Sequence, residues 1–238
     1  MSKEHSHSAL AELEEQPFLS ASAAGVVSIS IQGVPNAQGA IVSYTTLPAN
    51  LPKTYGNHIY VWQTTDNVVP WGKSPDGDTA IDTDNPTSTQ PITFSFEQKG
   101  YIIGYAVAAT PQAVVSTVYM PVGKQDDPAS WQYANVNLSV VYVGTDLVQV
   151  KYDGLPEYSP ATNKNWVGIW AGSQVPYSSS STPMRTVTIT QDAPPSGYLN
   201  LTGLKLTIGT QYCVGYFMVE ASKGRTSLGA QATFTIGQ

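Results

Sequence analysis

The 238-residue sequence contains few charged residues, and the sign of its charge argues against nucleic acid as a partner. Only 12% of the residues are Asp, Glu, Lys or Arg, and the formal net charge is −6. Binding to phosphates requires clustered Lys and Arg, whereas the 11 basic residues here are scattered. The same shortage disfavours attachment to an anionic membrane by charge alone.

Long apolar runs are also missing. No stretch approaches the roughly 18 apolar residues that a membrane-spanning helix needs. The first residues, MSKEHSHSALAELEEQPF, lack the apolar segment of a secretory signal. We therefore expect no transmembrane segment, and a protein that is made for the cytoplasm or exported without a cleaved signal peptide.

Cysteine and histidine are scarce as well. The single cysteine, Cys213, can form no internal disulfide, and it lies in the apolar run YCVGYFMV, which predicts a buried thiol. Beyond the first 22 residues the one histidine is His58, so acid–base catalysis near neutral pH has a single candidate. Phosphate-binding glycine-rich motifs are absent. These shortages favour a protein that is not an enzyme and that uses no organic cofactor.

The residues that are abundant, Val, Thr, Ser, Tyr, Gly and Pro, favour short strands separated by turns. The sequence also contains an internal repeat. The segment 165–177, NWVGIWAGSQVPY, has a weaker copy at 57–71, NHIYVWQTTDNVVPW, about 108 residues upstream. The residues that match without a gap are Tyr44, Leu47, Pro48, Asn57 and Trp62 in the first half and Tyr152, Leu155, Pro156, Asn165 and Trp170 in the second.

The repeat and the turn signals predict an all-β chain of two tandem immunoglobulin- or fibronectin-III-like β-sandwich domains, related by internal duplication. Runs with strand character, such as VVSISIQG and LVQVKYDGL, recur about seven times per 100 residues. We place a flexible leader at 1–22, the first sandwich at 23–124 and the second at 131–238. The matching positions predict that Trp62 and Trp170 are buried in equivalent surroundings.

One strand of the second half resembles a known family. The motif NWVGI at 165–169, followed by an aromatic residue, resembles the N-W-[IV]-G-[IL] strand of SKICH-type domains. Those domains are immunoglobulin-like sandwiches found in some phosphoinositide phosphatases and autophagy receptors. The first repeat departs from the motif, with HIY at 58–60. The resemblance implies the sandwich fold and, at most, contact with proteins or membranes.

The leader differs in composition from the rest of the chain. Its segment ALAELEE is long enough for one or two helical turns, which Pro17 ends, and so short a helix is marginal in water. We expect a mobile segment. The alternative is docking on a neighbouring copy through Leu10, Leu13 and Phe18.

The densest acidic tract, SPDGDTAIDTDN at 74–85, places four aspartates on one loop. Carboxylate oxygens are the ligands that Ca²⁺ prefers, although the spacing is not that of an EF-hand. Asp, Gly and Asn also serve as turn formers in solvated loops. A calcium site at Asp76, Asp78, Asp82 and Asp84 is therefore one interpretation, and a plain polar loop is the other.

Exposed aromatic side chains are the other candidate binding element. Trp71 and Tyr177 each follow Val-Pro at the end of a strand, where proline argues against a central position in a sheet. An exposed ring beside Asn, Asp and Ser loops suits a sugar or a protein surface. We predict a ligand-binding set of Trp71, Tyr177, Tyr55, Asn57 and Asn165. Packing between the two domains is the competing explanation for the rings.

These features favour a non-catalytic protein that binds or self-assembles, with a lectin-like or adhesive role. Its partners would be carbohydrate, a protein surface or copies of itself, since duplicated domains offer two similar surfaces. One alternative is a membrane-active toxin or effector that releases a hairpin at 106–120. Another is an enzyme in the cleft between the domains, which requires a polar pocket containing His58, Asp66 or Glu157 beside an aromatic wall.

Overall fold

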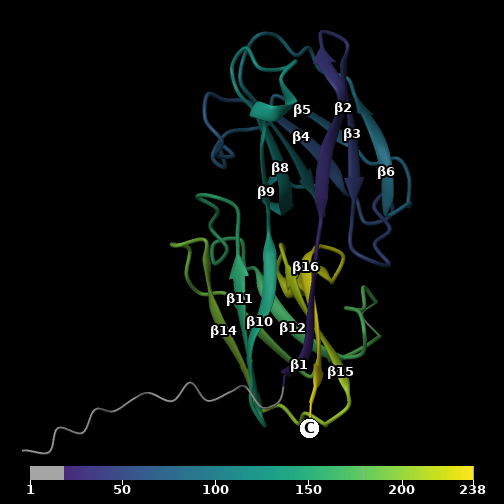
Figure 1. Cartoon of the computed structure of the whole chain (residues 1–238), viewed down its shortest axis with the longest axis vertical. Helices are drawn as coiled ribbons and strands as arrows, with labels where there is room; N and C mark the ends of the chain where they lie inside the picture. Colours follow the sequence, from purple (N-terminus) through teal and green to yellow (C-terminus); the bar gives the residue numbers. More distant parts are fainter. Residues whose placement is uncertain (1–18, 179, 238) are drawn as a thin grey trace, which may run out of the picture.

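The computed structural model describes residues 19–178 and 180–237. Within these ranges the chain forms 16 β-strands and three short 3-10 helices. Two β-sandwiches are stacked end to end along the long axis of the molecule (Figure 1). In the described ranges no helix is long and apolar enough to cross a membrane.

The first sandwich consists of a three-stranded and a five-stranded antiparallel sheet. The three-stranded sheet has the order β2-β3-β6, formed by β2 (Ser28–Asn36), β3 (Gly39–Thr45) and β6 (Thr87–Ile92). The five-stranded sheet has the order β5-β4-β7-β8-β9, formed by β4 (His58–Gln63), β5 (Gly77–Ala80), β7 (Tyr101–Ala106), β8 (Val114–Met120) and β9 (Gln132–Asn135). The 3-10 helices η1 (Pro111–Ala113) and η2 (Pro128–Ser130) precede β8 and β9.

The second sandwich repeats this plan. Its three-stranded sheet has the order β10-β11-β14, formed by β10 (Asn137–Val143), β11 (Leu147–Asp153) and β14 (Ser196–Thr202). Its five-stranded sheet has the order β1-β16-β15-β12-β13, formed by β1 (Leu19–Val26), β12 (Trp166–Ala171), β13 (Arg185–Thr188), β15 (Gln211–Phe217) and β16 (Leu228–Ile236). The third 3-10 helix, η3 (Ala221–Lys223), precedes β16.

The cores of the two sandwiches are built around tryptophans at matching positions. Trp62 is 0% exposed and Trp170 is 2% exposed. The indole Nε1 of Trp62 donates to the carbonyl oxygen of Lys73 at 3.2 Å, and that of Trp170 donates to the carbonyl oxygen of Ser181 at 3.3 Å. Each indole therefore binds the backbone of the loop that follows its own strand. The predicted equivalence of the two tryptophans is confirmed.

In each sandwich, a tyrosine near the start of β7 or β15 binds the backbone of the loop that precedes the strand. The hydroxyl oxygen of Tyr101 accepts a hydrogen bond from the backbone N–H of Glu97 at 3.1 Å, and that of Tyr212 accepts from Thr207 at 2.8 Å. This is the arrangement of the tyrosine corner in immunoglobulin-like sandwiches. Together with the sheet orders, it confirms the predicted fold class.

A second matched contact lies within each sandwich, where an aspartate of one loop binds a threonine of another. The carboxylate of Asp84 accepts from the backbone N–H and the hydroxyl of Thr54, both at 2.8 Å. The carboxylate of Asp192 accepts from the same two groups of Thr162, at 2.9 and 2.7 Å. These hydrogen bonds lower the pKa of both carboxyl groups. Such detailed agreement supports an origin by duplication.

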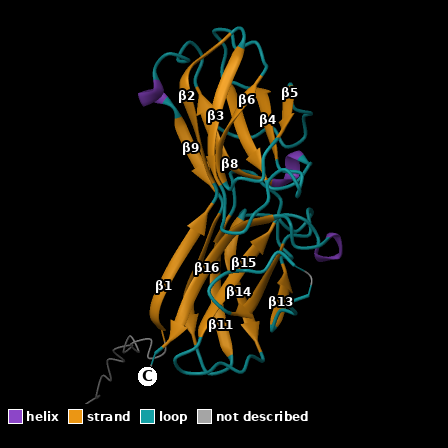
Figure 2. Ribbon diagram, turned by 90° about the vertical axis from the view of Figure 1, so that its right-hand side faces the viewer, coloured by secondary structure: helices purple, strands orange, loops and turns teal. Residues whose placement is uncertain are grey.

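The two sandwiches exchange strands where they meet. β1 precedes the first sandwich in sequence, but it pairs antiparallel with β16 of the second, from Leu19 opposite Ile236 to Val26 opposite Ala230. The chain then passes through Val27 into β2 of the first sandwich. In the other direction, β9 pairs with β8 of the first sandwich and continues through Val136 into β10 of the second. Figure 2 shows β1 beside β16 in the lower body.

This exchange corrects the predicted boundaries. Residues 19–22, expected in the leader, belong to strand β1. Residues 23–26 pair with the second sandwich, and residues 132–135 pair with the first, each opposite to the assignment made from sequence. The segment LSASAAGV alternates only over its first five residues and mainly with small side chains, so its strand character is weak in the sequence. The predicted anchors Leu10, Leu13 and Phe18 lie outside the described residues.

Removing β1 tests the strand exchange. A variant without residues 1–26 leaves one edge of β16 unpaired, whereas a variant without residues 1–18 keeps β1. We expect the shorter protein to melt several degrees below the longer one in a calorimetric scan and to self-associate through the open edge. Equal melting temperatures of the two variants would contradict a stabilising role for β1.

Candidate functional site at the domain junction

The second sandwich contacts the first through a tryptophan and a tyrosine. The indole Nε1 of Trp71 donates to the carbonyl oxygen of Pro156 at 3.0 Å. The Trp71 ring packs against Tyr158 with ring centroids 4.8 Å apart and an interplanar angle of 59°. The Tyr158 hydroxyl donates to the carbonyl oxygen of Gln112 at 2.8 Å. Trp71 is therefore held in one orientation by the opposite sandwich, with part of its surface exposed.

A second pair of rings joins the two sandwiches. Tyr177 stacks on Tyr55 with ring centroids 5.2 Å apart and an interplanar angle of 15°. Tyr177 is 9% exposed, and its burial raises the pKa of its phenol well above the ordinary value. Of the two explanations considered for Trp71 and Tyr177, packing between the domains therefore accounts for their surroundings. Tyr177 offers almost no surface to a ligand.

The two predicted asparagines lie inside the sandwiches. Asn57 and Asn165 are each 0% exposed. The amide oxygen of Asn57 accepts from the hydroxyl of Tyr105 at 2.9 Å, and that of Asn165 accepts from the hydroxyl of Tyr216 at 2.8 Å. Their backbone groups make matched bonds as well, each donating to a proline carbonyl oxygen five residues earlier. The repeat of asparagine therefore reflects the fold, and neither side chain reaches the surface.

A hollow of about 530 Å³ lies beside Trp71. Asp66 and Lys73 of the first sandwich line it together with Glu157 of the second. The Asp66 carboxylate accepts from the backbone N–H of Val68 at 3.2 Å, and Lys73 is paired with Asp76 at 2.8 Å. The hollow thus combines one aromatic wall with charged groups from both sandwiches.

Two further hollows extend this one along the junction. A hollow of about 260 Å³ shares Trp71 and Gly72 with the first. It also shares Gln112, Thr162 and Asn163 with a hollow of about 340 Å³ that reaches Glu220. We call the three together the junction groove. Its walls carry hydroxyls, amides and charges of both signs, which suit a polar ligand longer than a single small molecule.

The backbone at Glu157 is left-handed, with φ of 56°. A residue other than glycine in this conformation often marks functional strain. Here Ala49, at the matching position of the first sandwich, has φ of 63°. The conformation therefore belongs to the duplicated fold and gives the groove no special chemistry.

The four aspartates of the proposed calcium loop do not converge. Asp76 binds Lys73 and the backbone N–H of Gln63, the latter at 2.7 Å, while Asp84 binds Thr54. Across residues 19–178 and 180–237 no three His, Cys, Asp or Glu side chains gather closely enough to hold a metal ion. The tract is not one loop, because it contains strand β5, and the carboxylates of Asp76 and Asp84 on either side of that strand serve separate local contacts.

Neither reactive side chain singled out in the sequence faces the groove. His58 stacks on Tyr60 with ring centroids 5.7 Å apart, and its Nδ1 lies 2.9 Å from the carbonyl oxygen of Gly56. Cys213 is 0% exposed, as predicted, and burial raises the pKa of its thiol to about 11. The thiol therefore stays protonated at neutral pH.

Of the predicted ligand-binding set, the structure places Trp71 in the groove, Tyr55 half-buried against Tyr177, and the other three in the interior. Sequence reasoning missed Gln112 and Asn163 as groove residues. No sequence signal pointed to either, because the groove exists only where two distant loops meet. Asp66 and Glu157, considered for an enzyme, do line one hollow.

Comparisons with known proteins concern the fold alone. No protein-family model matches the chain, and no curated protein matches it. A two-domain fibronectin type III segment from chicken tenascin is 13% identical, covers 81% of this chain and 90% of its own, and has a TM-score of 0.25. The FN1–FN3 domains of chicken CNTN1 are 13% identical, with coverage of 88% and 66% and a TM-score of 0.29. Scores this low carry no argument, so the fold assignment depends on sheet order and the tyrosine corners.

Two tyrosines of the junction give a matched test of its packing. The Tyr177 hydroxyl is buried and has no hydrogen-bond partner among the described residues, whereas Tyr158 donates to Gln112. We expect Tyr158→Phe to lower the free energy of unfolding by about 1 kcal/mol, the usual net value of one hydrogen bond. Tyr177→Phe should leave it unchanged or raise it, because the lost hydroxyl is unpaired.

Urea denaturation of both variants measures the difference. A loss of stability in Tyr177→Phe equal to that in Tyr158→Phe would mean that the Tyr177 hydroxyl has a partner, such as a buried water molecule.

Proposed function

We propose that this protein is a non-catalytic binding protein whose two sandwiches act as one body and hold a polar ligand in the junction groove. The observation that carries the proposal is the position of Trp71. Its ring is half-buried, fixed by Pro156 and Tyr158 of the other sandwich, and lies in the wall of a groove with polar groups on both sides. A rigid aromatic surface gives contact area at little entropic cost.

The strand exchange supports this proposal because it organises the groove in advance. The walls come from different sandwiches, so their spacing depends on how the sandwiches are joined. Two crossings of the chain, at Val27 and Val136, restrain that joint. A ligand therefore does not have to order two independent domains on binding, a cost that would otherwise weaken its affinity.

Carbohydrate and a protein segment both fit the chemistry of the groove. A sugar chain would use the Trp71 ring and the amides of Gln112 and Asn163, whereas a peptide would also use the charges of Lys73 and Glu157. Self-assembly is a third use, in which a loop of a second copy enters the groove. A glycan array combined with light scattering separates these outcomes.

Catalysis in the same groove is a second candidate, because Asp66 and Glu157 line one hollow with Trp71. Most glycoside hydrolases require a pair of carboxylates that flank the bond to be cleaved. The double variant Asp66→Asn, Glu157→Gln separates the two functions. Binding without turnover that survives this change supports the non-catalytic function, whereas turnover of a bound glycan that the change abolishes supports the enzyme.

The membrane-active alternative receives little support from the geometry. The segment 106–120 includes β8, which is buried along its whole length and paired with β7 on one side and β9 on the other. Its release would break the five-stranded sheet of the first sandwich.

Tryptophan fluorescence offers a direct test of groove binding. Of the five tryptophans, Trp62, Trp131, Trp166 and Trp170 are buried, so iodide quenching reports mainly on Trp71. We expect a groove ligand to reduce iodide quenching and Trp71→Phe to abolish this response and weaken binding. Trp131→Phe, which removes a buried ring, is the matched control and should keep the response. A ligand that binds wild type and Trp71→Phe equally well would place the binding site elsewhere.

A further inference from the structure

The outer face of sheet β10-β11-β14 carries two exposed tyrosines. Tyr198 is 62% exposed and Tyr142 is 41% exposed. The inward side chains of this sheet, such as Val148 and Val150, are fully buried, so the tyrosines lie on the face that points away from the core. This face is part of the second sandwich alone and is separate from the junction groove.

A bulge in β10 turns Tyr142 outward. Val140 pairs with Val150, and Tyr142 pairs with Gln149, so Val141 is an extra residue in the strand. In a regular strand without the bulge, Tyr142 would point to the same side as the buried Val140, two residues earlier, because side chains alternate along a strand. The ring of Tyr142 lies close to Gly144, where a Cβ atom would come within 3.1 Å of it. Backbone irregularity and glycine together hold this tyrosine at the surface.

The polar groups between the tyrosines are paired and neutral in sum. Gln149 donates to the amide oxygen of Asn200 at 2.9 Å, and Lys151 is paired with Asp153 at 3.0 Å. The ion pair cancels the charge of the face, which therefore offers no preference for an anion or a cation. The amides retain free donors and acceptors for an uncharged ligand.

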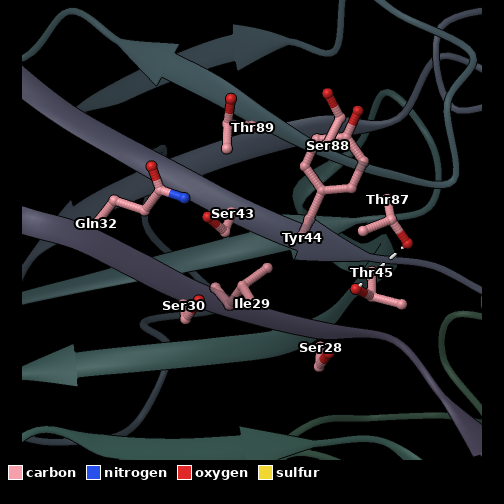
Figure 3. A pocket seen from close by; sticks show the side chains of 10 residues that line it. All are labelled: Ser28, Ile29, Ser30, Gln32, Ser43, Tyr44, Thr45, Thr87, Ser88 and Thr89. Atoms are coloured by element: carbon pink, nitrogen blue, oxygen red, sulfur yellow. Dashed lines mark hydrogen bonds between the residues drawn. The ribbon is translucent and has the colours of Figure 1, made fainter.

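The first sandwich provides an internal comparison. Ser43 and Thr89 face each other there in the register that Lys151 and Tyr198 occupy in the second sandwich. Figure 3 shows the corresponding strands, on which Ser43 and Thr89 carry small hydroxyls and the one ring drawn, that of Tyr44, is buried. The fold therefore does not require a tyrosine at position 198. Its presence is a property of the second sandwich.

The positions of the two tyrosines suit an extended ligand. Tyr142 lies opposite Gln149 and Tyr198 lies opposite Lys151, two residues further on, so the Cα atoms of the two tyrosines are about 12 Å apart. An extended ligand that rests on both rings fits this space.

We propose that the β10-β11-β14 face binds an uncharged polysaccharide chain. The apolar C–H faces of two sugar units pack on Tyr142 and Tyr198, since aromatic faces are electron-rich and attract polarised C–H groups. Gln149 and Asn200 hydrogen-bond to the hydroxyls of the sugars between them.

Pull-down with insoluble cellulose, chitin, β-1,3-glucan and starch, followed by affinity electrophoresis in soluble neutral glucans, tests the proposal on the full chain. We expect wild type to be retained by at least one neutral polymer. Tyr198→Thr, which installs the residue of the first sandwich, should weaken retention about tenfold. The double variant Tyr142→Ser, Tyr198→Thr should abolish it. Tyr133→Thr, at a tyrosine that is 51% exposed on β9, is the matched control and should bind like wild type.

Several results would overturn the proposal. They are failure of wild type to bind any neutral polymer, full retention by the double variant, and binding of acidic polysaccharides alone. Equal melting temperatures show that the variants are folded. Loss of retention in Trp71→Phe with full retention in the double variant would assign the sugar to the junction groove instead. Specific capture of a partner protein by this face would assign it to protein contact.

Discussion

Backbone pairing between β1 and β16 is the interaction on which the arrangement of this molecule depends. It joins a segment at the start of the described chain to the last strand, so that the second sandwich is completed by residues that precede the first. The counterpart is β9, which completes the first sandwich before the chain enters the second. Each crossing is a nearly continuous strand interrupted at one buried valine, Val27 or Val136. A joint of this kind resists bending more than a flexible linker does.

The contacts at the junction follow from that restraint. Trp71 meets Pro156 and Tyr158, and Tyr55 meets Tyr177, because the two bodies approach in a fixed way. The junction groove forms where loops of both bodies leave space beside Trp71. The β10-β11-β14 face lies on the outside of the second sandwich, where the fold does not require particular side chains. The first proposed site thus depends on how the repeats are joined, and the second on a difference between them.

The fold could be predicted from the sequence because duplication made its pattern visible. The matched tryptophans at 62 and 170 pointed to two equivalent cores, and both are buried with the same kind of backbone hydrogen bond. The offset of about 108 residues also links Thr54 and Asp84 to Thr162 and Asp192. This match in the sequence indicates that Asp84 has a structural role in its loop and is not a metal ligand.

The sites were harder to predict, for physical reasons. A repeated residue is conserved between repeats when the fold requires it, so Asn57 and Asn165 marked the interior and not a surface. The proposed binding surface lies where the repeats differ, as at Tyr198. Strand exchange was not predicted either, since the small residues of β1 give only a weak strand signal and the pairing joins segments about 200 residues apart. Contacts of that range depend on the assembled fold.

The register of β1 against β16 also determines how the molecule would respond to mechanical load. Leu19 lies opposite Ile236, so the first and last paired residues are neighbours at one pole. A force that pulls these two residues apart acts perpendicular to the strands β1 and β16, so it breaks the hydrogen bonds between them one after another. The second sandwich would lose its edge strand at low force while the first stayed folded. Pulling between the tips of the two sandwiches would instead load both crossings along their length, where many hydrogen bonds share the tension.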